Sequence, residues 1–113
     1  MIVKNREVKP FEVKSIAGAP LVGVASRKIL SSTKGMVLAE SFGKKGTVWP
    51  LHKHPERESV GYLVSGKLKM TIGGKEYILE PGDSWVHPFN VEHRTEHLED
   101  SVFIEVFSPP GKD

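Results

Sequence analysis

Short apolar runs separated by turn residues recur along the whole chain, and few segments have the length or the 3.6-residue period of a helix. The runs are rich in Val, Ile, Leu, Tyr and Phe, which favour strands. We expect strands over residues 11–15, 21–30, 36–42, 47–54, 59–64, 67–72, 75–79, 84–87, 92–97 and 101–107. Many short strands joined by regular turns are typical of a β-sandwich or a β-barrel. The predicted fold class is therefore all-β.

The clearest local signal is a hairpin over residues 66–79. Two alternating segments flank Gly73 and Gly74, and a Gly-Gly pair can adopt the positive φ values of a tight primed turn. At the other end of the chain, the Ser-Pro-Pro that begins at Ser108 cannot continue a strand ladder, because consecutive prolines lack N–H donors.

Length and composition narrow the class of protein. A chain of 113 residues is too short for two independent cores, so we expect one domain over residues 1–113. The formal net charge is only +2, which argues against a nucleic acid as the main partner. No segment has the apolar length of a membrane span or of a signal peptide, so a cytoplasmic protein is expected. There is no cysteine, so a disulfide scaffold, a thiolate metal site and a cysteine nucleophile are excluded.

Five large apolar side chains are expected in the core. They are Trp49, Trp85, Tyr62, Met36 and Met70.

Histidines carry the main chemical signal. His52 and His54 are two residues apart, so on a strand they point to one face, about 6.6 Å from each other. Glu58 follows in a segment that can bend back, and His93 could arrive from another strand. Three imidazoles and a carboxylate suit one divalent transition metal, namely Zn, Ni, Fe, Mn or Cu. Surface histidines without a metal are the alternative.

The frame around these histidines resembles the two motifs of the cupin superfamily. Gly46-Thr-Val-Trp-Pro-Leu-His-Lys-His-Pro-Glu-Arg-Glu58, ending at Gly66, is similar to the first motif, and Gly82-Asp-Ser-Trp-Val-His-Pro-Phe-Asn-Val-Glu-His93 is similar to the second. The resemblance implies a single-domain cupin barrel with motif 1 at about residues 46–66 and motif 2 at about residues 82–97. It also implies that His52, His54, Glu58 and His93 hold the metal.

Three positions depart from the motif. Asn90 stands where the family has Gly, a mild change because Asn tolerates a left-handed conformation. His97 stands where the motif often ends in Asn, and it is either a group that contacts a ligand or a histidine at the rim. Seven residues, not six, separate Glu58 from Gly66. Either the strand carries a bulge, or Ser59 occupies the ligand position and three histidines bind alone; we take Glu58 as the ligand.

Within the superfamily, the chain resembles small cupins of pectin degradation that convert 4,5-unsaturated uronates to linear keto sugars. The sequence segments shared with these cupins include Gly61-Tyr-Leu-Val-Ser-Gly66 and Leu98-Glu-Asp-Ser-Val102. That family closes with Asp-x-Phe and an Arg, thought to handle the sugar acid. The matching positions are Glu105, Phe107 and Gly111, so the Arg is absent and only Lys112 lies beside its position. Lys cannot form the bidentate carboxylate pair of Arg.

The last strand leaves two orientations open. Val102, Ile104 and Val106 alternate with Phe103, Glu105 and Phe107. If the first set fills the barrel, Glu105 is a carboxylate at the rim; if the second does, Glu105 lies among aromatic rings near the metal. The resemblance favours the second orientation.

The predicted function is isomerisation or tautomerisation of a small sugar acid or related oxygenated metabolite. Glu105 would move protons, Phe107 and His97 would contact the small-molecule ligand, and the metal would act as a Lewis acid. An Fe- or Ni-dependent dioxygenase and a non-catalytic metabolite-binding domain are the alternatives. The apolar segment 21–25 and the last strand offer more apolar surface than one barrel absorbs, so we expect a homodimer.

Overall fold

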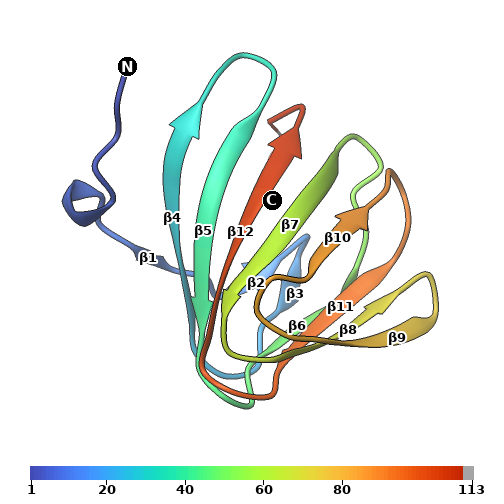
Figure 1. Ribbon diagram of the computed structural model, residues 1–113. Coiled ribbons are helices and arrows are strands. Elements are labelled where there is room, and N and C mark those ends of the chain that lie inside the picture. Colours follow the sequence, from blue (N-terminus) through green and yellow to red (C-terminus); the bar gives the residue numbers. More distant parts are fainter. Residues whose placement is uncertain (111–113) are drawn as a thin grey trace.

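Two antiparallel β-sheets face one another in the structure, a computed structural model that describes residues 1–110 (Figure 1). The larger sheet has the strand order β1-β4-β5-β12-β7-β10, and the smaller has the order β6-β11-β8-β9. The strands of the larger sheet are β1 (Phe11–Glu12), β4 (Ala25–Ser32), β5 (Val37–Gly43), β12 (Ser101–Ser108), β7 (Glu58–Ser65) and β10 (Ser84–His87). Those of the smaller are β6 (Val48–His52), β11 (His93–His97), β8 (Leu68–Ile72) and β9 (Lys75–Leu79). The all-β prediction is confirmed.

The segment before β4 differs from the prediction. A short ribbon of β2 (Ser15–Ile16) and β3 (Ala19–Pro20) turns through Ala17 and Gly18, both at positive φ. This turn shortens the strand expected over residues 11–15. The strand expected over 21–30 starts only at Ala25, although Val22 forms a bridge with Val48. A 3-10 turn, η1 (Asn5–Glu7), precedes β1. Among the described residues, no helix is long and apolar enough to cross a membrane.

The predicted hairpin is present. β8 pairs with β9 in register from Leu68 opposite Leu79 to Ile72 opposite Lys75. Gly73 has φ +57° and Gly74 has φ +82°, the left-handed values that a primed two-residue turn requires. In β6, Pro50 is tolerated because β6 is an edge strand of the smaller sheet.

Every second side chain along the strands points inward, and these side chains fill the space between the sheets. The buried apolar cluster consists of Val13, Ala25, Trp49, Leu63, Leu68, Met70, Trp85 and Phe103. Trp49, Trp85 and Met70 are therefore core residues, as predicted. Tyr62 and Met36 are not, being 46% and 50% exposed. Tyr62 points outward from β7, because its neighbours Gly61 and Leu63 take the buried positions of the alternation. Met36 lies in the turn before β5.

A bulge in β7 determines which residues of this strand face inward. Val102 pairs with Ser65 but Phe103 pairs with Leu63, so Val64 is the extra residue. Upstream of the bulge, the buried positions of β7 are Ser59, Gly61 and Leu63. The inward position that faces the smaller sheet is consequently Ser59.

Candidate metal centre

Three of the predicted ligands converge between the two sheets. His52 is the last residue of β6 and pairs across the sheet with His93, the first residue of β11. His54 lies two residues beyond His52, and its ring centroid is 4.9 Å from that of His52 and 5.8 Å from that of His93. The candidate ligand atoms of the three side chains all lie within 4.8 Å of one another.

The hydrogen bonds of these histidines favour a metal. Nδ1 of His52 is 2.6 Å from the carbonyl oxygen of Pro50, and Nδ1 of His93 is 3.2 Å from that of Val91. A carbonyl oxygen only accepts, so each Nδ1 carries the proton and each Nε2 keeps its lone pair. A backbone carbonyl that fixes the tautomer in this way is typical of histidine metal ligands. The donor set therefore fits a borderline transition metal.

The rings are also in the protonation state that a metal requires. Burial lowers the pKa of His52, and burial together with the nearby His87 lowers the pKa of His93 to about 2. Both rings are thus neutral at neutral pH. A metal need not displace protons from them.

Glu58 does not join this cluster. Its side chain is exposed at the start of β7, whereas Ser59 is buried and faces inward. The prediction of Glu58 as the fourth ligand therefore differs from the structure, because the bulge at Val64 sets the parity of β7. The alternative, with Ser59 in that position and three histidines as ligands, matches the geometry.

Glu105 reaches the same space from the opposite sheet. It lies on β12 with Ser101, Phe103 and Phe107 on the buried face, so the second of the two predicted orientations is the observed one. Glu105 and Trp85 flank Gly61 on adjacent strands. A Cβ at Gly61 would overlap the Trp85 ring, so a glycine is required for this close packing.

Burial raises the pKa of the Glu105 carboxyl, and the Arg27 guanidinium partly offsets that rise. Oε1 of Glu105 is 3.6 Å from a terminal nitrogen of Arg27, and Oε2 is 3.6 Å from Nδ1 of His87. Burial lowers the pKa of His87 to about 3, so His87 is neutral at neutral pH and its contact with Glu105 is not an ion pair. Glu105 is therefore a buried carboxylate beside the cationic side chain of Arg27.

Sequence reasoning missed three members of the site. His87 lies on β10 and stacks on His93 with ring centroids 3.7 Å apart. Arg27 and Arg57 are buried and line the cavity. Alternation with Trp85 could have placed His87 inward once Trp85 was assigned to the core. The two arginines carry no local signal, since a lone Arg in a strand or turn is most often exposed.

Of the two residues predicted to contact a ligand, Phe107 lies in the cavity and His97 lies in the core. Phe107 lines the cavity, as expected of a ligand contact. His97 has no exposed surface, and the Trp49 indole N–H donates to its Nε2 at 2.8 Å. Trp49 thus stands between His97 and the histidine cluster, and His97 is a core residue, neither a rim histidine nor a ligand contact. Asn90, which replaces the glycine of the motif, has φ +61°, the left-handed value expected there.

The cavity between the sheets has a volume of about 30 Å³. His52, His54 and His93 line it together with Glu105, Arg27, Arg57, His87, Ser59, Phe107 and core side chains that include Trp49, Met70 and Trp85. This space holds a water molecule or two. Gly111 and Lys112, the positions at and beside the missing Arg, lie outside the described residues.

Known proteins share both the sequence pattern and the fold. Residues 41–107 match the Cupin domain family. A pectin degradation protein, KdgF of Dickeya dadantii (strain 3937), is 31% identical over 88 residues, which cover 77% of this chain and 80% of that protein. The solved structure of KdgF from Halomonas sp. superposes with a TM-score of 0.86 at 29% identity, over 100% of this chain and 96% of that one.

A second solved structure extends the likeness of the fold. A predicted oxalate decarboxylase from Thermotoga maritima has a TM-score of 0.86 at 22% identity and covers 97% of this chain and 100% of its own. The matched segment contains both histidine motifs, and the paired sheets enclose them as the motifs require. The chain belongs to the cupin family.

Proposed function

We propose that this cupin catalyses a metal-dependent isomerisation of a small sugar acid or related oxygenated metabolite, with a 4,5-unsaturated uronate as the substrate to test first. One observation carries the proposal. A three-histidine cluster and a buried carboxylate, Glu105, face one cavity from opposite sheets. The similarity to KdgF supports the choice of substrate class.

The histidine cluster would hold one divalent transition metal at His52, His54 and His93. When bound, the metal supplies a Lewis acid that polarises a substrate oxygen. Conversion of an unsaturated uronate to a linear keto sugar is an isomerisation, so no oxidant is consumed. The ring C–O bond breaks, one proton leaves a hydroxyl and one proton is added to carbon. The protein must therefore move a proton between two substrate atoms.

Glu105 is the residue that we assign to this proton transfer. Its carboxyl is buried, which raises its pKa toward the range in which it can both accept and donate a proton. Phe107, two residues along the same strand, also lines the cavity and would pack against the substrate.

The experiment compares wild type with Glu105→Gln in turnover of a 4,5-unsaturated uronate, followed by loss of its ultraviolet absorbance. Gln keeps the shape of Glu but cannot transfer the proton. Turnover should fall by roughly 10²- to 10⁴-fold, the usual scale for general acid–base catalysis. The matched control is Glu76→Gln, which changes an exposed carboxylate on β9 that pairs with Lys69.

Metal content is measured in the same preparations. Loss of metal in Glu105→Gln would show that the carboxylate supports the metal site and does not shuttle protons. If no uronate reacts and oxygen is consumed with another substrate, a dioxygenase replaces this proposal. Binding without turnover would instead identify a non-catalytic ligand-binding domain.

We further propose that the chain acts in the cytoplasm as a homodimer. The outer face of the larger sheet supports the second point. Val60, Tyr62 and Val64 of β7 and Val86 of β10 are about half exposed on that face. Burying such a patch against a second copy would remove apolar surface from water.

A further inference from the structure

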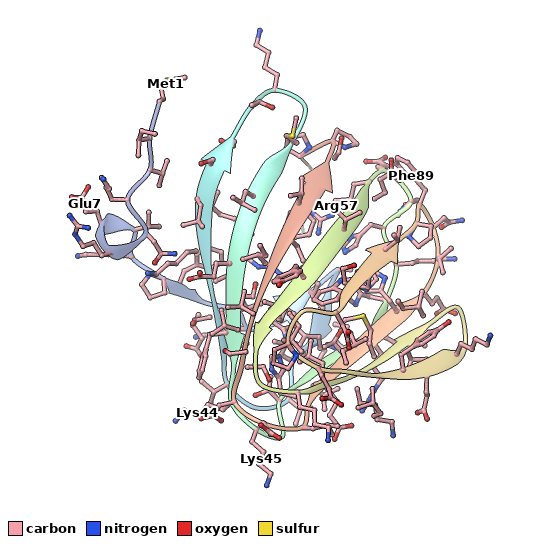
Figure 2. The ribbon with its side chains drawn as sticks, viewed as in Figure 1. Met1, Glu7, Lys44, Lys45, Arg57 and Phe89 are labelled. Atoms are coloured by element: carbon pink, nitrogen blue, oxygen red, sulfur yellow. The ribbon has the colours of Figure 1, made fainter. Side chains whose placement is uncertain are left out.

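His87 is a buried side chain in the cavity to which the proposed function gives no role. It is the last residue of β10, and it is 6% exposed. Across the antiparallel pair of β10 and β7 it lies opposite Ser59, the inward position at the start of β7. Figure 2 shows Arg57 and Phe89, which lie two residues from Ser59 and from His87 in the chain, at the same end of the sandwich. His87 therefore lines the cavity from the end of β10.

One face of the His87 ring packs on a candidate metal ligand. The rings of His87 and His93 are stacked, with their centroids 3.7 Å apart and their planes 10° from parallel. His87 is outside the group of three histidines whose ligand atoms lie within 4.8 Å of one another, so its contact with the site is through His93. A metal ligand needs a fixed ring orientation, because its free nitrogen must point at the ion. The stack supplies such a restraint for His93.

The edge of the same ring points at the carboxyl group that we assign to proton transfer. Nδ1 of His87 is 3.6 Å from Oε2 of Glu105 and 3.5 Å from Oγ of Ser59. Nε2, on the other side of the ring, is 3.4 Å from Sδ of Met70. An ionised carboxylate only accepts hydrogen bonds, whereas a thioether sulfur accepts them weakly. The favourable tautomer of His87 therefore carries its proton on Nδ1.

His87 connects the two halves of the site. His93 belongs to the smaller sheet, and Glu105 lies on β12 of the larger sheet, separated from β10 by β7. The His87 ring reaches across β7 at Ser59, whose short side chain leaves room for it. One ring thus contacts both a candidate metal ligand and the buried carboxylate on the opposite sheet.

We propose that His87 is a positioning residue, whose ring face holds the orientation of His93 and whose Nδ1 edge holds the carboxylate of Glu105. The inference rests on the proposed function for the role of Glu105 in moving the proton. Proton transfer by a side chain depends on its distance and angle to the reacting atom. By contacting both groups, the ring fixes the carboxylate relative to the histidine cluster.

Two substitutions separate the two contacts of this ring. His87→Phe keeps a ring that can stack on His93 but lacks Nδ1, whereas His87→Asn lacks the ring but places an amide nitrogen near the position of Nδ1. We expect His87→Phe to retain the metal and to lower kcat for a 4,5-unsaturated uronate by roughly 10- to 100-fold at unchanged KM, the scale of a residue that orients an active-site group. His87→Asn should recover part of this kcat. It should also bind Zn²⁺ roughly 2- to 10-fold more weakly, the scale of a stacked ring pair.

Nuclear magnetic resonance of the chelated protein tests the contact with Glu105 without turnover. Two-bond proton–nitrogen correlations of a histidine ring report which nitrogen carries the proton, and that choice is set by the neighbouring hydrogen-bond partners. The proton of His87 should be on Nδ1 in the wild type and should shift toward Nε2 in Glu105→Ala. A proton on Nε2 in the wild type would overturn the proposal, even if no variant folds. An unchanged tautomer in Glu105→Ala would also overturn it.

Ser84→Asn is the matched control, because it introduces the same side chain at an exposed position of β10. It should leave kcat, the Zn²⁺ affinity and the His87 tautomer unchanged. Unchanged kcat in folded, metal-loaded His87→Phe would refute the positioning of Glu105. Equal Zn²⁺ affinity of the wild type and His87→Asn, measured by competition with a chromophoric chelator, would refute the positioning of His93.

Failure of the proposed function is distinguishable from failure of this inference. If the wild type turns over no uronate, the proposed function fails, while the His87 tautomer and the Zn²⁺ affinities still test both contacts of the ring. If the wild type turns over the uronate but the proton of His87 is on Nε2, only the positioning role is refuted.

Discussion

His97 offers a quantitative test of how the core is organised. It is fully buried behind Trp49, whose indole N–H donates to Nε2. Protonation of Nε2 would put two donors face to face in a site without water access. Burial lowers the pKa of His97 to about 4, and the negative charge of the nearby Asp100 opposes only part of this shift. His97→Gln removes the titrating group and keeps an oxygen that can accept from Trp49.

The magnitude follows from the two pKa values. The unfolded chain protonates His97 near the ordinary histidine pKa of 6.5, whereas the folded chain does so only near 4. Between these values the unfolded state binds more protons, so the free energy of unfolding falls as the pH falls. At about 1.4 kcal/mol per pH unit, the loss reaches roughly 3 kcal/mol by about pH 4. Above the unfolded pKa the titration contributes nothing.

The assay is urea unfolding of wild type and His97→Gln from about pH 7.5 to about pH 4, with a chelator present. We expect the variant to be about 1–2 kcal/mol less stable at neutral pH, because Gln fills less of the core than His. The difference should shrink by about 3 kcal/mol on acidification to about pH 4, so it should reverse in sign between about pH 6 and about pH 5. Titrations shared by the two proteins cancel in this comparison.

Parallel stability curves for the two proteins would refute the reasoning. They would show that His97 titrates alike in the folded and unfolded states, and hence that its ring is hydrated in the native protein.

The remaining predictions concern the metal site and the assembly. Purified protein should contain about one transition-metal ion per chain, and replacing both His52 and His54 by Ala should abolish metal binding; retention of the ion, measured by elemental analysis, would exclude the site. Glu58→Ala should retain the metal, because Glu58 faces solvent, and loss of metal would restore it as a ligand. Light scattering should show a dimer for the wild type. Tyr62→Lys should convert the dimer to a monomer, because this change places a charge on the outer face of the larger sheet. A wild-type monomer at micromolar concentration would contradict the proposed dimer.

Sequence patterns between near neighbours in the chain predicted the fold class and part of the candidate site. The alternation of apolar residues and the Gly73-Gly74 turn depend on near neighbours in the chain, and they indicated the hairpin and the all-β class. The spacing of His52 and His54 places both side chains on one face of an extended segment. For these features the sequence was sufficient, because backbone geometry alone relates the residues.

The tertiary structure decided which side of each strand faces the cavity. A one-residue bulge at Val64 placed Ser59 inward and left Glu58 in solvent, and spacing alone could not choose between them. Arg27 and Arg57 meet at Phe107 only because β4, β7 and β12 belong to one sheet. The physical reason is that strand parity follows from register and bulges, which are set by pairing between residues far apart in the chain.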